Sequence, residues 1–249
     1  MKVGLFSIIT VFIMFGGGLN HSSTQLKPKT ILHRADEARG NVEGVKWKLY
    51  IHSLEGGRTQ ERKLNVKAKG YDFLAILTSP PRVKGQKLLM VSHNMWFAKP
   101  GLKKSVPISP RQKLVGGASY GDIAATNYAD DYEATPLKDE VIDKELCYVY
   151  DLKAIAKNAT YDRIKYWISK ERFVGVKAEY FTVSGKMFKS ATFEYGNKVQ
   201  VRNKPRPFIS KMIITDAIVR SNITTMNFNR PSLVKVPAST FDLNLFMMR

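Results

Sequence analysis

A mainly β, α+β fold built on one large antiparallel sheet is predicted by three features of this 249-residue sequence. Short apolar segments recur at a spacing of roughly 8–12 residues and are joined by short polar turns, which is typical of consecutive antiparallel strands. Several segments alternate apolar and polar residues, as strands with one buried and one solvated face do. Strands do not alternate with long helices, which argues against a parallel sheet. Because long sheets twist, we expect this one to curl or to close.

The first residues, which precede all of these segments, have the pattern of a secretory signal peptide. Lys2 comes before an apolar run from Val3 to Phe15, and small residues follow. The run is shorter than the roughly 20 apolar residues that a transmembrane helix needs. We therefore expect residues 1–22 to be a signal peptide and residues 23–249 to form one exported domain. An uncleaved membrane anchor is the alternative.

A helix and a pair of strands open the rest of the chain. Residues 29–40 place four apolar side chains at helical spacing and end at Gly40, a good helix stop. Residues 44–55 and 62–70 alternate apolar residues with lysines, so each strand has one apolar face and one basic face. The stretch "EGGR" at residues 55–58 predicts a hairpin turn between them.

The remaining elements follow in order along the chain. Residues 71–80 are apolar on both faces, so we expect both sides of that strand to be covered, and residues 85–100 add one or two more strands. Prolines and glycines make residues 99–136 a loop-rich segment with a short helix at residues 120–132. Strands then resume in the segments 132–142, 146–154, 162–171, 173–182, 187–196, 207–217 and 221–229.

Charge and cysteine content limit the partners and the chemistry. The net charge of +19 is typical of proteins that meet an anionic partner, although an excess of solvated surface lysines explains it equally well. Export disfavours nucleic acid as that partner. Cys147 is the only cysteine, so no disulfide can form within the chain, and we expect a buried, inert thiol. We expect no cofactor and no metal, and we interpret the pair Asp130–Asp131 as a solvated turn rather than a calcium site.

The stretch "GASYG", residues 117–121, matches the G-x-S-x-G nucleophile elbow of α/β-hydrolases. That motif requires a parallel sheet, a strand before the serine, and a histidine later in the chain. Here a proline- and glycine-rich loop precedes Ser119, and all histidines precede it as well. We therefore expect no catalytic residue and no enzyme. The glycines supply turn dihedrals, and Ser119 or Tyr120 forms local hydrogen bonds near Asp122.

The middle of the chain resembles the outer-membrane lipoprotein-sorting protein family, the LolA-like carriers. The resemblance lies in "MWFAKPGLKKSVPISPRQKLVGGASYGDIAATNYADDYEATPL", together with the helix "ILHRADEARG" before a long meander. The matching residues are Met95, Trp96, Pro100, Lys103, Lys104, Ile108, Ser109, Gly116, Ser119, Tyr120 and Asp122. The resemblance implies an incomplete, half-open β-barrel whose concave face is covered by a few helices.

The same resemblance implies a function in the periplasm. The expected protein binds acyl chains of a lipoprotein or lipid on its concave face and moves them towards the outer membrane, with transient inner- and outer-membrane partners. The alternative is an envelope sensor or accessory protein on the same fold, which assists an inner-membrane partner such as a lipid exporter. An anionic membrane surface is a further possible partner, and nucleic acid is not expected.

Strand alternation names candidate lining residues, for which ordinary core is the first alternative, and the loop segment contains a basic run that could equally be a solvated surface. The candidate acyl-chain lining is Trp47, Leu49, Ile51, Leu64, Val66, Phe73, Leu77, Leu88, Met90, Trp96 and Trp167. The candidate residues for docking to a membrane or partner are Lys99, Lys103, Lys104, Arg111 and Lys113. Methionine and aromatic side chains suit an adaptable apolar pocket, but they also suit any core.

Overall fold

The computed structural model describes residues 26–201 and 204–248. The helices are α1 (Pro28–Glu37), α2 (Tyr128–Asp131) and α3 (Leu243–Met248), and the 3-10 helices are η1 (Pro81–Val83), η2 (Tyr120–Ile123) and η3 (Ala238–Phe241). The strands are β1 (Val45–Glu55), β2 (Arg58–Lys69), β3 (Asp72–Ser79), β4 (Lys87–Val91), β5 (Asn94–Ala98), β6 (Val106–Ile108), β7 (Lys113–Val115), β8 (Ala118–Ser119), β9 (Tyr132–Ile142), β10 (Glu145–Ala154), β11 (Arg163–Ser169), β12 (Gly175–Phe181), β13 (Met187–Glu194), β14 (Asn197–Val201), β15 (Lys204–Phe208), β16 (Lys211–Asp216) and β17 (Ile223–Leu233).

The expected signal peptide, residues 1–22, lies outside the described residues. Within residues 26–201 and 204–248, no helix combines the length and the apolar character that crossing a membrane would require.

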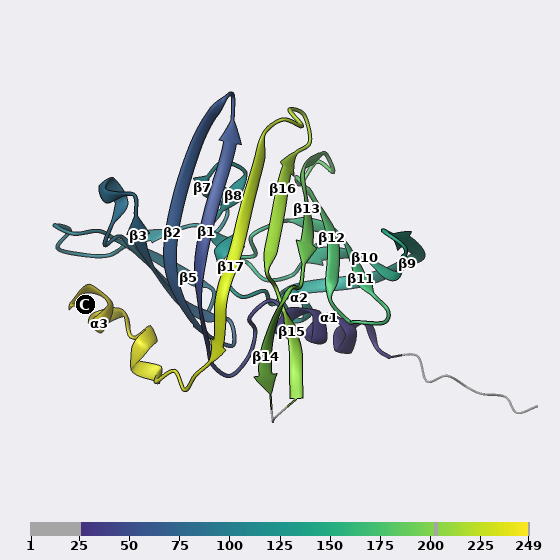
Figure 1. The fold of residues 1–249 in the computed structure, drawn as a ribbon, viewed down its shortest axis with the longest axis horizontal. Helices are drawn as coiled ribbons and strands as arrows, with labels where there is room; N and C mark the ends of the chain where they lie inside the picture. Colours follow the sequence, from purple (N-terminus) through teal and green to yellow (C-terminus); the bar gives the residue numbers. More distant parts are fainter. Residues whose placement is uncertain (1–25, 202–203, 249) are drawn as a thin grey trace, which may run out of the picture.

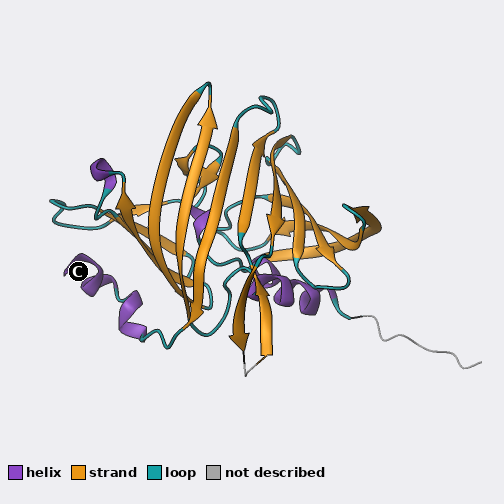
Figure 2. Ribbon diagram, in the orientation of Figure 1, coloured by secondary structure: helices purple, strands orange, loops and turns teal. Residues whose placement is uncertain are grey.

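Thirteen strands form one antiparallel sheet in the order β6-β5-β4-β3-β2-β1-β17-β16-β13-β12-β11-β10-β9 (Figure 1). The late strand β17 pairs with β1 on one side and β16 on the other, and so joins the two halves of the chain. The outermost strands, β6 and β9, do not pair with each other, so the sheet curves strongly without closing (Figure 2). The predicted curved, half-open antiparallel sheet is confirmed.

The two faces of the sheet differ in what covers them. The face that we call inner packs against α1, η2 and α2, and the side chains of both layers form one buried apolar cluster. On β1 and β2, register pairs such as Trp47 with Val66 and Leu49 with Leu64 point to this inner face. The alternate residues, including Lys46 and its register partner Lys67, stand exposed on the opposite, outer face. The expected alternation is therefore confirmed.

The C-terminal segment covers part of the outer face. Phe241 of η3 and Phe246 of α3 pack on Leu74 of β3 and Leu89 of β4, which point away from the inner face. Strand β3 is thus buried from both sides, as its doubly apolar pattern predicts. No helix was predicted in this C-terminal segment, because one turn of η3 and six residues of α3 are too short to display a helical period.

Two other regions differ from the predictions. The helix expected at residues 120–132 is two short elements, η2 and α2, because Ala124 between them has extended backbone. The β14–β15 hairpin was not predicted. Pro205 and Pro207 lie in β15, and proline in a run of residues argues against a central strand. The structure tolerates both because β15 pairs with β14 alone, outside the large sheet.

Candidate functional site

The inner face of the sheet brings most of the predicted lining residues together. One buried cluster contains Trp47, Leu49, Ile51, Leu64, Val66, Phe73, Leu77, Leu88 and Met90. They come from four adjacent strands, β1 to β4, whose registers place them side by side. The result is a continuous apolar wall along the concave side of the curved sheet.

Two predicted lining residues do not lie on this wall. Trp96 packs with the outer-face residues Leu74 and Leu89 under the C-terminal segment. Trp167 forms a separate outer-face cluster with Cys147 and Val149, and its indole N–H donates to Glu140 at 2.8 Å. Both residues stand out of phase with the inner positions of their strands, so neither belongs to the apolar wall, although Trp96 lines the cavity described below. The expected burial of the Cys147 thiol is confirmed.

A layer of short elements, which we call the cover, closes the apolar wall. It consists of residues 28–39 with α1 and residues 113–131 with β7, β8, η2 and α2. Ile31 and Leu32 of α1, Ile123 of η2 and Tyr128 of α2 enter the same buried cluster as the wall. In this structure the cover's own side chains occupy the space in front of the wall.

A buried ion pair ties the cover to the sheet. The Lys189 ammonium of β13 lies 2.9 Å from Asp122 Oδ2 and donates to the Gly117 carbonyl at 2.8 Å. The Tyr161 hydroxyl donates to the other oxygen of Asp122 at 2.5 Å. Both charged side chains are almost fully buried, at 5% and 3% exposed. Such a pair is stable only while every partner remains in place.

A local signal for this pair exists in the sequence, although neither residue was among the predicted site residues. Lys189 stands in phase with Ala191 and Phe193, which are inner-face residues of β13. A lysine at an apolar-face position indicates a buried partner of opposite charge. The identity of that partner could not be predicted, because Asp122 lies far from it in the sequence and reaches it only through the loop fold.

A second link joins α1 to α2 and to the sheet. The backbone N–H of Ala129 donates to Asp36 Oδ2 at 2.9 Å. Burial raises the pKa of the Asp36 carboxyl to about 7, and hydrogen bonds from the Ala129 and Tyr128 backbone offset part of that effect. The Arg39 guanidinium lies over the rings of Phe193 in β13 and Tyr128 in α2, with centroid distances of 4.4 and 5.5 Å.

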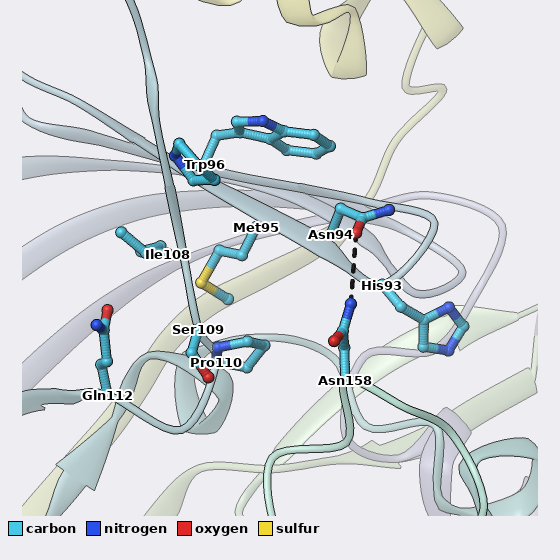
Figure 3. Close-up of a pocket in the computed structure, with 10 residues that line it drawn as sticks. His93, Asn94, Met95, Trp96, Ile108, Ser109, Pro110, Gln112 and Asn158 are labelled. Atoms are coloured by element: carbon cyan, nitrogen blue, oxygen red, sulfur yellow. Dashed lines mark hydrogen bonds between the residues drawn. The ribbon is translucent and has the colours of Figure 1, made fainter.

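A cavity of about 320 Å³ opens at the β5–β6 edge of the sheet (Figure 3). Met95 and Ile108 point into it, and both pack in the inner-face cluster, so the cavity reaches the apolar wall from the side. Its rim is polar and includes Asn94 and Asn158, whose side chains hydrogen-bond to each other at 3.3 Å. The volume is at the lower end of the range for ligand pockets.

The residues weighed for catalysis and metal binding have structural partners. The Ser119 N–H donates to Asp122 Oδ2 at 2.8 Å, and the Ser119 side chain caps η2 in return. This confirms the expected local hydrogen bonding. His93 Nε2 lies 2.7 Å from the buried Asp131 carboxylate, whereas the neighbouring Asp130 pairs with Lys29 at 2.8 Å. The two aspartates face different partners, and the interpretation of Asp131 as a solvated turn residue was wrong.

The candidate docking residues fall into two groups. Arg111 pairs with Asp162 at 2.6 Å, and Lys113 pairs with Glu55 at 2.6 Å, so both are engaged within the molecule. Lys99, Lys103 and Lys104 lie exposed on the connection between β5 and β6. In the described part of the chain, no group of three or more histidine, cysteine, aspartate or glutamate side chains is placed to hold a metal ion.

Comparisons with known proteins agree with this architecture. A family model described as "Uncharacterized protein" matches residues 70–246. A LolA superfamily protein from Nitrosomonas europaea has a similar structure, with a TM-score of 0.79 and 26% identity, over 89% of this chain and 100% of that one. No curated protein sequence matches the chain.

Two further solved structures have the same fold at lower identity. A putative outer membrane lipoprotein-sorting protein domain from Vibrio parahaemolyticus is 18% identical, with a TM-score of 0.73, over 88% of this chain and 97% of its own. A DUF1329 family protein from Desulfovibrio piger is 16% identical, with a TM-score of 0.74 and the same shares covered.

Proposed function

This chain belongs to the LolA-like outer-membrane lipoprotein-sorting family, and from that premise we propose that it is a carrier that shelters the acyl chains of a lipoprotein or lipid against the inner face of its sheet. The observation that carries the proposal is the continuous apolar wall of β1 to β4 behind a cover made of short, separate elements. Burial of hydrocarbon on such a wall requires no chemistry.

When a ligand binds, its acyl chain replaces the apolar side chains of the cover on the wall. Each buried methylene contributes about 0.8 kcal/mol, so about ten of them contribute on the order of 8 kcal/mol. The cover is joined to the sheet through a few buried polar contacts, among them Lys189 with Asp122. An acyl chain that replaces the cover's side chains on the wall can therefore offset the loss of those contacts. The cavity beside Met95 and Ile108 is the natural point of entry, because it already touches the wall.

The surroundings of the carrier follow from the same proposal. Residues 1–22 direct export, residues 23–249 form the working domain, and the protein acts in the periplasm between transient inner- and outer-membrane partners. Of the basic docking residues, Lys99, Lys103 and Lys104 remain the ones available to a partner, since Arg111 and Lys113 are paired internally.

A reversible lock on the cover tests the proposal. The Gly117 N–H of the cover donates to Thr224 Oγ1 of β17 at 2.8 Å, and a Cβ at position 117 would lie 3.6 Å from that oxygen. Because Thr224 Oγ1 marks the place of a cysteine Sγ, the two side chains of a Gly117→Cys/Thr224→Cys variant are neighbours and can be oxidised to a disulfide once Ile214 Cγ2, 3.1 Å from the new Cβ, shifts slightly. We expect the oxidised variant to lose more than about tenfold in affinity for a fluorescent long-chain fatty acid, and the reduced variant to recover it.

The matched control places a disulfide where it cannot restrain the cover. Lys48 and Asn65 are register partners on the outer face of β1 and β2, so a Lys48→Cys/Asn65→Cys variant stays within the sheet. It should bind equally well oxidised and reduced. Equal binding by the locked and unlocked cover would show that the acyl chain does not lie beneath it. An absence of binding by the unmodified chain would remove the carrier function altogether.

A further inference from the structure

One end of the sheet displays a group of exposed apolar side chains. We define the strand-end patch as four exposed residues: Leu54 in β1, Ile218 and Val219 in the β16–β17 connection, and Ile223 in β17. Ile218 is 73% exposed and Val219 is 47% exposed. Leu54 and Ile223 are register partners, so the patch spans two neighbouring hairpin ends, which lie together at the top of Figure 1.

The backbone that presents the patch is tightly hydrogen-bonded. Asp216 Oδ1 accepts from the N–H groups of Ile218 and Val219 at 2.8 and 2.7 Å. Asn222 Oδ1 accepts from the N–H of Gly56 at 3.0 Å, which joins the two hairpin ends to each other. A turn fixed in this way holds its apolar side chains outward. Large exposed apolar groups gathered in one place are uncommon unless they contact a membrane or a partner.

Positive charge flanks the patch. Arg58 begins β2 and Arg220 lies between Val219 and Ile223, and both are exposed. Neither arginine forms an ion pair with another residue in the described part of the chain. Apolar side chains bordered by unpaired arginines match the boundary of an anionic bilayer, where hydrocarbon and phosphate meet. An acidic protein surface would engage the arginines but would leave the isoleucines and valine in water.

The geometry points to an anchoring function: the strand-end patch inserts into the interface of an anionic phospholipid membrane. The β7–β8 part of the cover lies at the same end of the sheet, because the N–H of Gly117 between these two strands bonds to Thr224, the neighbour of Ile223. Insertion of the patch therefore brings the β7–β8 part of the cover towards the bilayer surface. This inference goes beyond acyl-chain carriage, since it concerns a different surface and does not depend on what lies behind the cover.

Single-site fluorescence tests the inference with residue resolution. Cys147 is buried and is the only native cysteine, so an Ile218→Cys variant can be labelled selectively with a polarity-sensitive nitrobenzoxadiazole dye. We expect the emission to shift to the blue and rise when vesicles of mixed phosphatidylglycerol and phosphatidylcholine are added. The same label at Val141, an exposed apolar residue on β9 at the sheet edge, should not respond. If the emission of the dye at position 218 does not change while the protein is bound to vesicles, the inference is wrong.

Vesicle co-sedimentation of the full chain supplies the second measurement. An Ile218→Asp/Val219→Asp variant should bind at least about tenfold more weakly, because two apolar side chains lose their burial. The control is Val141→Asp/Leu146→Asp, an exposed register pair with 65% and 51% exposure and the same change in charge. All variants share the same N-terminal residues, so that stretch cannot produce a difference. If both variants lose the same affinity for vesicles, the loss results from the change in net charge alone, which would contradict the inference.

The arginines separate charge from apolar insertion. An Arg58→Gln/Arg220→Gln variant should bind anionic vesicles about fivefold more weakly for each arginine removed, and its affinity should depend less on salt. Both arginine side chains are exposed, so replacing them should not disturb the fold. This variant therefore tests the inference even if the two aspartates of Ile218→Asp/Val219→Asp distort the turn. Unchanged affinity and salt dependence would show that the patch does not recognise anionic lipid.

Discussion

The buried pair between Lys189 and Asp122 offers the sharpest test of how the cover is held. In a Lys189→Met variant the aliphatic stem keeps its place, but the ammonium that lies 2.9 Å from Asp122 Oδ2 is gone. The Asp122 carboxylate would then remain buried with hydrogen bonds from the Tyr161 hydroxyl and the Ser119 N–H alone. Breaking one side of a buried pair costs about 3–5 kcal/mol, because the remaining charge is uncompensated.

A double-mutant cycle isolates the interaction from the packing changes. Asp122→Asn alone leaves the buried Lys189 ammonium without a charged partner, beside the Gly117 carbonyl and the rings of Tyr161 and Tyr180, so it should also destabilise the protein by about 3 kcal/mol or more. The Lys189→Met/Asp122→Asn variant contains no buried charge at this site, and the asparagine can still accept from Ser119. We expect the double variant to be more stable than the sum of the single changes predicts by about 2 kcal/mol.

Urea unfolding followed by circular dichroism provides the free energies. The geometry also predicts that Lys189→Met loosens the cover, so uptake of a fluorescent fatty acid should become faster while the secondary structure is retained. Two results would refute the reasoning. One is a loss below about 1 kcal/mol for Lys189→Met, and the other is strict additivity of the two single changes, since either would mean that the pair does not hold the cover.

Two further predictions concern other contacts of the cover. Burial raises the folded-state pKa of Asp36 from 3.8 to about 7, so the contribution of this carboxyl to stability is complete below about pH 4 and is lost as the pH rises to about 7. The Asp36→Asn variant should therefore show a flatter pH dependence of the unfolding free energy between these two pH values. An unchanged slope would contradict the raised pKa of Asp36. The Gly116→Ala variant should lose about 1–3 kcal/mol more unfolding free energy than Gly56→Ala, measured by thermal or urea unfolding. Both glycines have φ of +55°, but only a Cβ at position 116 meets other side chains, Ser53 at 2.4 Å and Thr224 at 2.3 Å. Equal losses would show that the cover loop is free to move away from the sheet.

The inner wall was predictable because strand alternation is a local signal. A period of two assigns each residue of β1 and β2 to a face, and every residue chosen from these strands lies on the wall. The two tryptophans were assigned by residue type rather than by phase. Met95 and Trp96 are adjacent in β5 and must point to opposite faces, so only one of them could contribute to the wall.

The sequence by itself determined the large antiparallel sheet, its basic outer face on β1 and β2, and the absence of the strand and histidine order that a hydrolase elbow needs, because these depend on local periodicity and chain order. Only the tertiary structure decided that β17 lies between β1 and β16, that Asp122 of the cover meets Lys189 of the sheet, and that a hydrogen bond joins the hairpin end that carries Ile218 to the one that carries Leu54. The physical reason is that such contacts join segments far apart in the chain, and no local pattern specifies which distant partner a buried charge or an exposed apolar group will find.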